Sequence, residues 1–135
     1  MLAPLPVLLE ILDDMAEDGL GGPVLRVLRR RRDPELLREM VARVGSSSWF
    51  IRDVSCAVLG ELKDRRATPV LLIALHDREL MVRRTAAFAL AFIKDPESEA
   101  EVRRTYAGAR TDNINFRMAL ECALDELGAT YERHP

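Results

Sequence analysis

Three segments of this chain align with one another without a gap, and this repetition constrains the fold more than any other feature of the sequence. The segments begin at Ile51, Val82 and Phe116, which are 31 and 34 residues apart. Each opens with an apolar residue followed by Arg, and small or apolar residues fill its fifth and eighth places. The ninth place is Leu59, Leu90 or Leu124, and the twelfth is Leu62, Ile93 or Leu127. These places form one stripe of a helix with 3.6 residues per turn, so the pattern predicts three equivalent helices with the three leucines buried.

Shorter helical segments separate the three repeated ones. Thr68-Pro69 precedes an apolar run and is typical of a helix start, with Thr68 as the N-cap. Ser98 and Glu101 have the spacing of a capping box. A period of about 30 to 34 residues is typical of stacked supersecondary units. We therefore expect an all-α solenoid of about four stacked antiparallel helix pairs. The expected shorter helices cover residues 7–15, 23–32, 35–44, 70–75 and 98–110.

Composition supports one soluble helical domain over residues 1–135. Hydrophobic residues make up 48% of the chain and aromatic residues only 5%, so the core must consist mainly of aliphatic side chains. The net charge is −2, which provides no overall positive field for nucleic acid. The apolar N-terminus lacks the basic region of a secretory signal, and nothing has the length of a membrane span. We expect a cytoplasmic protein that does not enter a membrane.

The residues Val82-Arg83-Arg84-Thr85-Ala86-Ala87-Phe88-Ala89-Leu90 resemble the Val-Arg-x-x-Ala-x-x-Ala-Leu core of HEAT repeats, in the short form of the phycobilisome-lyase type. Residues 63–72 resemble the loop and first helix of that repeat, and His76-Asp77 resembles its inter-helix turn. The resemblance implies a HEAT-like superhelix, with degenerate repeats over 1–45, clear repeats over 46–128 and a tail over 129–135. It specifies an architecture and leaves the function open, because this fold is a general scaffold.

The resemblance also implies a role for the Arg that recurs at the second place of each segment. Arg52, Arg83 and Arg117 are expected to form salt bridges or carbonyl hydrogen bonds between units, for example Arg83 with Asp77 or Asp64.

Residue patterns with catalytic chemistry are missing from the sequence. It has no Gly-rich phosphate loop, no nucleophile elbow and only two histidines. His76 is placed to cap the end of a first helix, and His134 falls in a tail that we expect to fray. Cys56 and Cys122 have no metal-ligand spacing and should not form a disulfide. We expect no catalytic residue, no metal site, no cofactor and no enzymatic activity.

A partner protein is expected on the concave side of the stack, which second helices line in HEAT-like folds. The side of these helices away from the stripe carries Asp53, Cys56, Ala57 and Gly60; Arg84, Ala87, Phe88 and Ala91; and Met118, Glu121, Cys122 and Asp125. An Arg and two aromatics one turn apart make a plausible binding hot spot. The candidate partner-binding residues are Asp53, Arg84, Phe88, Phe92, Met118, Glu121 and Asp125.

Two aromatic features have more than one interpretation. Phe88 and Phe92 are either exposed anchors or fill the groove against a neighbouring helix, where Ala57 and Gly60 leave space. Trp49-Phe50, expected at an inter-helix turn, has the same ambiguity, and core packing is favoured there. The acidic rim of the face, which includes Glu61 and Glu126, would suit a protein partner with a basic or mixed surface.

A basic run supports a second interpretation. Arg26, Arg29 and Arg30 share one helix face, and they either cap a helix end in solvent or form a basic patch for an acidic protein or for nucleic acid. The favoured function is a non-enzymatic protein-binding scaffold, either a regulatory adaptor or a bacterial immunity or antitoxin protein. The alternatives are a subunit of a bilin-lyase-type enzyme and nucleic-acid binding through residues 26–32.

Overall fold

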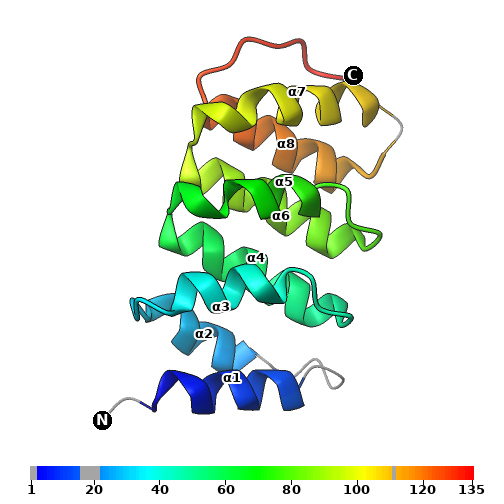
Figure 1. Cartoon of the computed structure of the whole chain (residues 1–135). Coiled ribbons are helices and arrows are strands. Elements are labelled where there is room, and N and C mark those ends of the chain that lie inside the picture. Colours follow the sequence, from blue (N-terminus) through cyan, green and yellow to red (C-terminus); the bar gives the residue numbers. More distant parts are fainter. Residues whose placement is uncertain (1–2, 16–21, 111) are drawn as a thin grey trace.

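A computed structural model describes residues 3–15, 22–110 and 112–135, and in these ranges all regular structure is helical. Within the described ranges, eight α-helices form four pairs that stack in chain order (Figure 1). The first helices of the pairs are α1 (Leu5–Asp14), α3 (Leu36–Arg43), α5 (Thr68–Ala74) and α7 (Glu99–Gly108). The second helices are α2 (Gly22–Arg30), α4 (Trp49–Leu62), α6 (Leu80–Ile93) and α8 (Ile114–Glu126). The expected all-α solenoid is confirmed.

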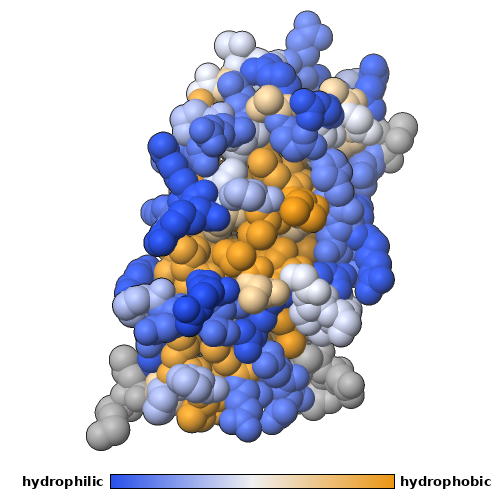
Figure 2. Space-filling view, viewed as in Figure 1, coloured by the Kyte–Doolittle hydropathy of each residue, from blue (hydrophilic) through white to orange (hydrophobic). Residues whose placement is uncertain are grey.

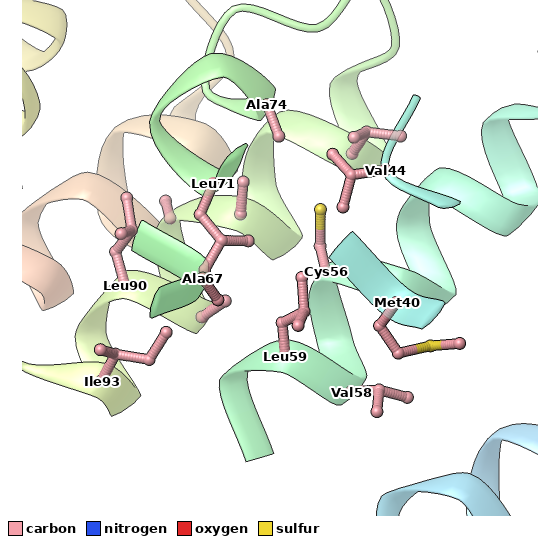
Figure 3. Packing of buried hydrophobic residues seen from close by; sticks show 14 of the residues in the cluster. Met40, Val44, Cys56, Val58, Leu59, Ala67, Leu71, Ala74, Leu90 and Ile93 are labelled. Atoms are coloured by element: carbon pink, nitrogen blue, oxygen red, sulfur yellow. The ribbon is translucent and has the colours of Figure 1, made fainter. Parts of the chain in front are cut away.

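Second helices form the spine of the stack. The packing of α4 against α6 and of α6 against α8 is the most extensive in the molecule, and α3, α5 and α7 lie in front of this row in Figure 1. Leu59, Leu90 and Leu124 are each 0% exposed, as their shared place in the repeat predicts. Aliphatic side chains from α3, α4, α5 and α6 meet in one cluster between the units (Figure 3).

The repeated helices begin two residues before the aligned segments. Trp49 is therefore the first residue of α4 rather than part of a turn, and the Ser48 hydroxyl caps this helix by accepting a hydrogen bond from the Ile51 N–H. The favoured core packing is wrong for Trp49, which is 45% exposed because the first turn of α4 extends past the core. Phe50 is half-buried and meets the Trp49 ring edge-on at 6.0 Å.

Helices begin at Thr68 and after Ser98 as predicted, but the capping roles predicted for these two side chains are wrong. Thr68 lies inside α5, and its hydroxyl has no hydrogen-bond partner among the described residues. The Ser98 hydroxyl donates to the Asp95 carbonyl, 2.7 Å away, instead of capping α7. Short 3₁₀ turns, Arg65–Ala67 and Pro96–Ser98, lead into both helices and change the position of these side chains.

A Lys-Asp pair ends both α4 and α6. Lys63 and Lys94 adopt left-handed backbone conformations, with φ of 54° and 55°. Each is followed by an Asp whose carboxylate accepts a backbone N–H two residues further on, which starts the 3₁₀ turn. The equivalent position after α8 is Gly128, with φ of 70°. Positive φ costs energy for residues other than Gly, and in both places an Asp turn follows the left-handed Lys directly.

The recurring Arg residues connect loops and units, as the resemblance implies. Arg52 forms a two-pronged pair with Asp77 of the next unit, at 2.8 and 3.0 Å. Arg83 donates to the backbone carbonyl of Asp77 and pairs with Asp112, at 3.5 Å. Arg117 donates to the carbonyl of Arg110. The carboxylate partner of Arg83 is therefore Asp112, and not Asp77 or Asp64.

The prediction that the C-terminal tail frays is wrong, because the tail packs against α7 and α8. His134 stacks on Tyr106 of α7 at 4.2 Å between ring centroids, and its backbone N–H donates to the Tyr106 hydroxyl. Tyr131 meets the Tyr106 ring edge-on at 5.5 Å. The tail crosses the end of the stack (Figure 1), where it covers the last helix pair. Within the described ranges, no helix is long and apolar enough to cross a membrane.

Candidate functional site

The exposed face of the second helices consists of the third, seventh and eleventh places of the repeated segments. These places carry Asp53, Ala57 and Glu61 in α4; Arg84, Phe88 and Phe92 in α6; and Met118, Cys122 and Glu126 in α8. The sixth and tenth places, which were expected on this face, are buried in α4 and α6. Cys56, Gly60, Ala87 and Ala91 therefore do not belong to it, because neighbouring helices approach closely enough to cover such small side chains.

A hollow of about 250 Å³ opens in this face between α2, α4 and α6. Its lining combines small residues, two aromatic rings and two guanidinium groups. The lining residues are Arg29, Ala57, Arg84, Thr85, Phe88, Ala89 and Phe92. The tertiary structure thus brings Arg29 of the basic run to the aromatic patch on α6, two features that the sequence presents as alternatives. We refer to these seven residues as the second-helix hollow.

The two phenylalanines differ in burial. Phe92 is 49% exposed and lies close to Gly60, where an added Cβ would be 3.3 Å from its ring. Phe88 is half-buried and packs against the core, while one part of its ring lines the hollow. The guanidinium of Arg84 lies 6.0 Å from the centroid of the Phe88 ring. Phe92 therefore has the exposure of an anchor, and Phe88 combines the two expected roles.

Asp53 is hydrogen-bonded to Thr85, one of the residues that line the hollow. Its carboxylate accepts a hydrogen bond from the Thr85 hydroxyl at 2.5 Å. Burial raises the pKa of Asp53, and the Thr85 hydrogen bond and the positive charges of Arg84 and Arg29 oppose this rise without cancelling it. Both guanidiniums are thus close enough to act on this carboxylate, although neither donates a side-chain hydrogen bond to a described residue.

The arginines of the basic run at residues 26–32 fall into two groups in the structure, one with partners within the chain and one exposed on α2. Arg31 forms a pair with Asp33 at 2.6 and 2.7 Å, and Arg32 donates to the carbonyls of Arg29 and Arg31. Arg26, Arg29 and Arg30 are exposed on α2, and Arg29 is the member of this set that lines the hollow. The run is therefore not one continuous basic patch.

Glu121 and Asp125 lie apart from the hollow and interact with the tail. Glu121 accepts hydrogen bonds from the Tyr106 hydroxyl at 2.6 Å and from Arg133 at 2.5 Å. Asp125 accepts from Tyr131 at 2.7 Å and from Arg133 at 3.0 Å. The hydrogen bond from Tyr131 and the pair with Arg133 lower the pKa of Asp125 despite partial desolvation. These two residues occupy the sixth and tenth places of the third repeated segment. In the first two segments these places are buried by neighbouring helices, and in the third they contact the C-terminal tail.

Met118, the remaining candidate, is 57% exposed on α8. It shares the third place of the repeat with Asp53 and Arg84, so it continues the exposed stripe beyond α6.

Outside the hollow, the described side chains that could act as an acid, a base or a nucleophile include one histidine in an ion pair and two cysteines. His76 lies 3.0 Å from a Glu101 carboxylate oxygen, in a pair that joins α5 to α7. Cys56 and Cys122 are free thiols, as predicted, and burial raises the pKa of Cys56 to about 12. Among the described residues, no group of three or more His, Cys, Asp or Glu side chains is arranged to hold a metal ion.

An apolar patch on the first helices is a surface that the sequence interpretation did not identify. Ile73 is 71% exposed on α5, its neighbours Val70 and Leu72 in that helix are half-buried, and Val41 of α3 is half-buried as well. Figure 2 shows apolar side chains gathered over α3 and α5 on this side of the molecule. The sequence does contain a pattern that predicts this patch. Residues 70–75 are all apolar, and a helix of that composition has no polar side to present to solvent.

A stack of helix pairs with inter-unit Arg–Asp contacts and an exposed second-helix face defines a helical-repeat scaffold of the α-solenoid class. A family model for HEAT repeats matches residues 5–91, which is more than half of the chain. The protein therefore belongs to the HEAT-repeat family. The match includes residues 5–45, where the repeat pattern in the sequence is weak.

One curated relative is a deoxyhypusine hydroxylase from Bos taurus. The chain is 39% identical to it over 82 residues, which are 58% of this chain and 23% of the hydroxylase. The chain thus spans less than a quarter of that relative's length.

Proposed function

We propose that this protein is a non-enzymatic scaffold that binds a partner protein through the exposed face of its second helices. HEAT repeats commonly mediate protein interactions, and this chain belongs to the HEAT-repeat family. The observation that supports this face is the second-helix hollow, where the 49% exposed Phe92 lies beside Phe88 and Arg84. Aromatic and Arg side chains around a pocket are the residues most enriched in binding hot spots.

The partner in this proposal has a mixed surface. It makes an apolar contact with the two phenylalanines, and its charged groups meet Arg84 and Asp53. One form of the function is an immunity or antitoxin protein that blocks a single cognate toxin in the bacterial cytoplasm. The free thiols of Cys56 and Cys122 support a reducing compartment.

Site-specific photo-crosslinking of the full chain tests the proposal. A photoreactive phenylalanine analogue is placed at residue 92 on the second-helix face, or at residue 73 on the first-helix patch, and the protein is irradiated in the cell that makes it. We expect a discrete protein adduct from position 92 and none from position 73. An adduct from position 73 alone would contradict the proposed surface and assign binding to the first-helix patch.

The captured protein is then purified and its affinity measured by calorimetry. Phe92→Ala should weaken binding about tenfold or more, as expected for a hot-spot residue, while Ile73→Ala has no effect. Equal melting temperatures of the two variants establish that the loss is not due to unfolding. Unchanged affinity of Phe92→Ala would show that the hollow is not the docking site.

A further inference from the structure

The charges available in the second-helix hollow are positive, although the sequence suggested an acidic face. With the exception of Glu61, which does not line the hollow, the acidic residues that the sequence suggested for this face already have a partner within the chain. Asp53 accepts from Thr85, Glu126 pairs with Lys94 at 3.1 Å, and Glu121 and Asp125 pair with Arg133. A basic partner would have to displace these contacts, whereas the Arg29 and Arg84 side chains donate no hydrogen bond to a described residue.

The hollow also has a place for an apolar side chain. Its volume of about 250 Å³ is of the order of one large side chain, and Ala57 and Ala89 leave this space beside the two phenylalanines. Phe92 is 49% exposed, so an apolar group placed against it removes apolar surface from water. Arg29 and Arg84 line the same hollow, so one pocket offers both guanidinium groups for an anion and aromatic rings for an apolar group.

We infer that the second-helix hollow binds an acidic segment of the partner protein, in which an Asp or Glu side chain pairs with Arg84 and Arg29 and an adjacent large apolar side chain contacts Phe88 and Phe92. This inference rests on the proposed function and specifies the chemistry of the partner. Guanidinium–carboxylate pairs are charge-assisted and directional, so they select acidic segments over neutral ones.

A protein segment fits this surface better than a nucleic acid does. Arg and aromatic side chains also bind single strands, but such sites follow the backbone with a long positive groove. The hollow has two Arg residues, and Asp53 and Glu61 lie on the same helix face beside it. The net charge of the chain is −2. A polyanion longer than the hollow would therefore meet carboxylates at its edge.

Selection from a phage-displayed library of short random peptides tests the inference on the full chain. We expect the selected peptides to carry Asp or Glu next to Phe, Leu or Trp. The selected peptides are then synthesised together with versions in which each acidic residue is replaced by Lys. Fluorescence anisotropy should show binding of the acidic peptides and no binding of their Lys versions.

Variants of the chain locate the charge effect. Arg84→Gln should weaken binding of the acidic peptide about tenfold, which corresponds to the loss of one hydrogen-bonded charge pair. Asp53→Asn should tighten it several-fold, because the substitution removes a negative charge beside the site. Arg65→Gln is the matched control, since Arg65 is an exposed Arg outside the hollow, and it should leave the affinity unchanged.

The outcomes separate this inference from the proposed function. Selected peptides that depend on Phe92 but carry no acidic residue would overturn the inference and leave the proposed function in place. Failure to select any peptide, or unchanged affinity in both Arg84→Gln and Asp53→Asn, would also overturn it. Tighter, Arg84-dependent binding of a labelled oligo-dT than of the acidic peptides would overturn both in favour of a single-stranded nucleic acid.

Discussion

At the scale of single residues, Arg52 connects two successive units through a buried set of hydrogen bonds. It is 6% exposed, pairs with the Asp77 carboxylate and donates to the carbonyls of Ser46 and Ser47. The same side chain thus fixes the loop before α4 and the loop after α5, which belong to successive units. Removal of the guanidinium would leave the Asp77 carboxylate and the two carbonyls without a hydrogen-bond donor in a site that water reaches poorly. Each of these polar atoms would then cost free energy in the folded state.

Removal of this guanidinium is expected to be costly. Arg52→Ala should lower the free energy of unfolding by about 3–5 kcal/mol, because it leaves the Asp77 charge unpaired in a poorly hydrated site. Arg66→Ala is the control: Arg66 also pairs with an Asp, but 78% of its side chain is exposed, so the loss should be much smaller than that of Arg52→Ala. Urea denaturation measures both values, and equal losses would contradict the structural role of Arg52.

The same pair predicts a dependence on pH. Burial raises the pKa of Asp77, but the hydrogen bonds from Arg52 and from the Glu79 N–H outweigh this and lower it overall. A lowered pKa in the folded state contributes stability above the unfolded value of about 3.9, and this contribution is lost as the pH falls through the folded value.

The stability difference between the wild type and Asp77→Asn should therefore be largest near neutral pH and shrink as the pH falls below about 4. Protonated Asp77 and Asn have the same charge, which is why the two proteins converge. Denaturation curves at several pH values provide the comparison. A difference that does not change with pH would mean that the charge of Asp77 contributes nothing to stability.

At the scale of helices, the close approach of α4 and α6 depends on one glycine. A Cβ at Gly60 would lie 2.9 Å from the Ala89 Cα and 3.0 Å from the Ala89 Cβ. The Ala89 Cα belongs to the backbone, so a rotamer change cannot relieve the contact. The small residues at Gly60 and Ala89 therefore allow the close approach of the two helices.

Gly60→Ala is expected to destabilise the protein despite the better helix propensity of Ala. Overpacking should cost about 1–3 kcal/mol relative to the same substitution at Gly108, which also lies in a helix but has open space around it. Thermal denaturation of the two variants gives the comparison. If both substitutions raise the melting temperature, the close approach does not constrain the helices.

Residues 129–135 cover the outer side of α7 and α8. Terminal repeats need a polar cover for the surface that no neighbour buries. Here Tyr131, Arg133 and His134 supply it over Tyr106, Glu121 and Asp125.

Deletion of residues 129–135 should lower the free energy of unfolding by about 1–3 kcal/mol, since two aromatic contacts with Tyr106 are lost. Hydrogen exchange should accelerate in α7 and α8 but not in α4. Arg133→Gln alone should have a small effect, because 59% of that side chain is exposed. Unchanged exchange in α7 after the deletion would show that the tail is not a cap.

At the scale of the whole molecule, stability depends on the contacts between units. The row of α4, α6 and α8 forms one continuous core, to which first helices attach on one side. Leu90 lies in the middle of this row and is completely buried.

Leu90→Ala should therefore destabilise the entire stack by about 2–5 kcal/mol, because the cavity forms where two units meet and cannot collapse easily. The control is Ile73→Ala, a similar loss of apolar volume at a 71% exposed position, which should change stability little. Chemical denaturation followed by circular dichroism measures both. A Leu90→Ala protein as stable as Ile73→Ala would place the core elsewhere.

The sequence by itself determined the three repeated helices and their buried leucines, whereas the Arg contacts between units were implied by the resemblance to HEAT repeats. These features follow from apolar periodicity and from a repeated local motif, which act over a few residues. Helix caps were harder to predict. Thr68 and Ser98 both have capping chemistry, but each follows or ends a 3₁₀ turn: Thr68 lies inside α5, and Ser98 is at the N-cap of α7 with its hydroxyl bonded to Asp95 instead.

Only the tertiary structure decided which residues away from the stripe reach water. Cys56 and Ala87 are buried because the helices approach so closely, and that distance depends on side chains of neighbouring units. The same holds for Arg29, which joins Phe92 in one hollow although 63 residues separate them in the chain. Periodicity within one helix indicates a face, but the rotation and spacing of adjacent helices determine what that face contains.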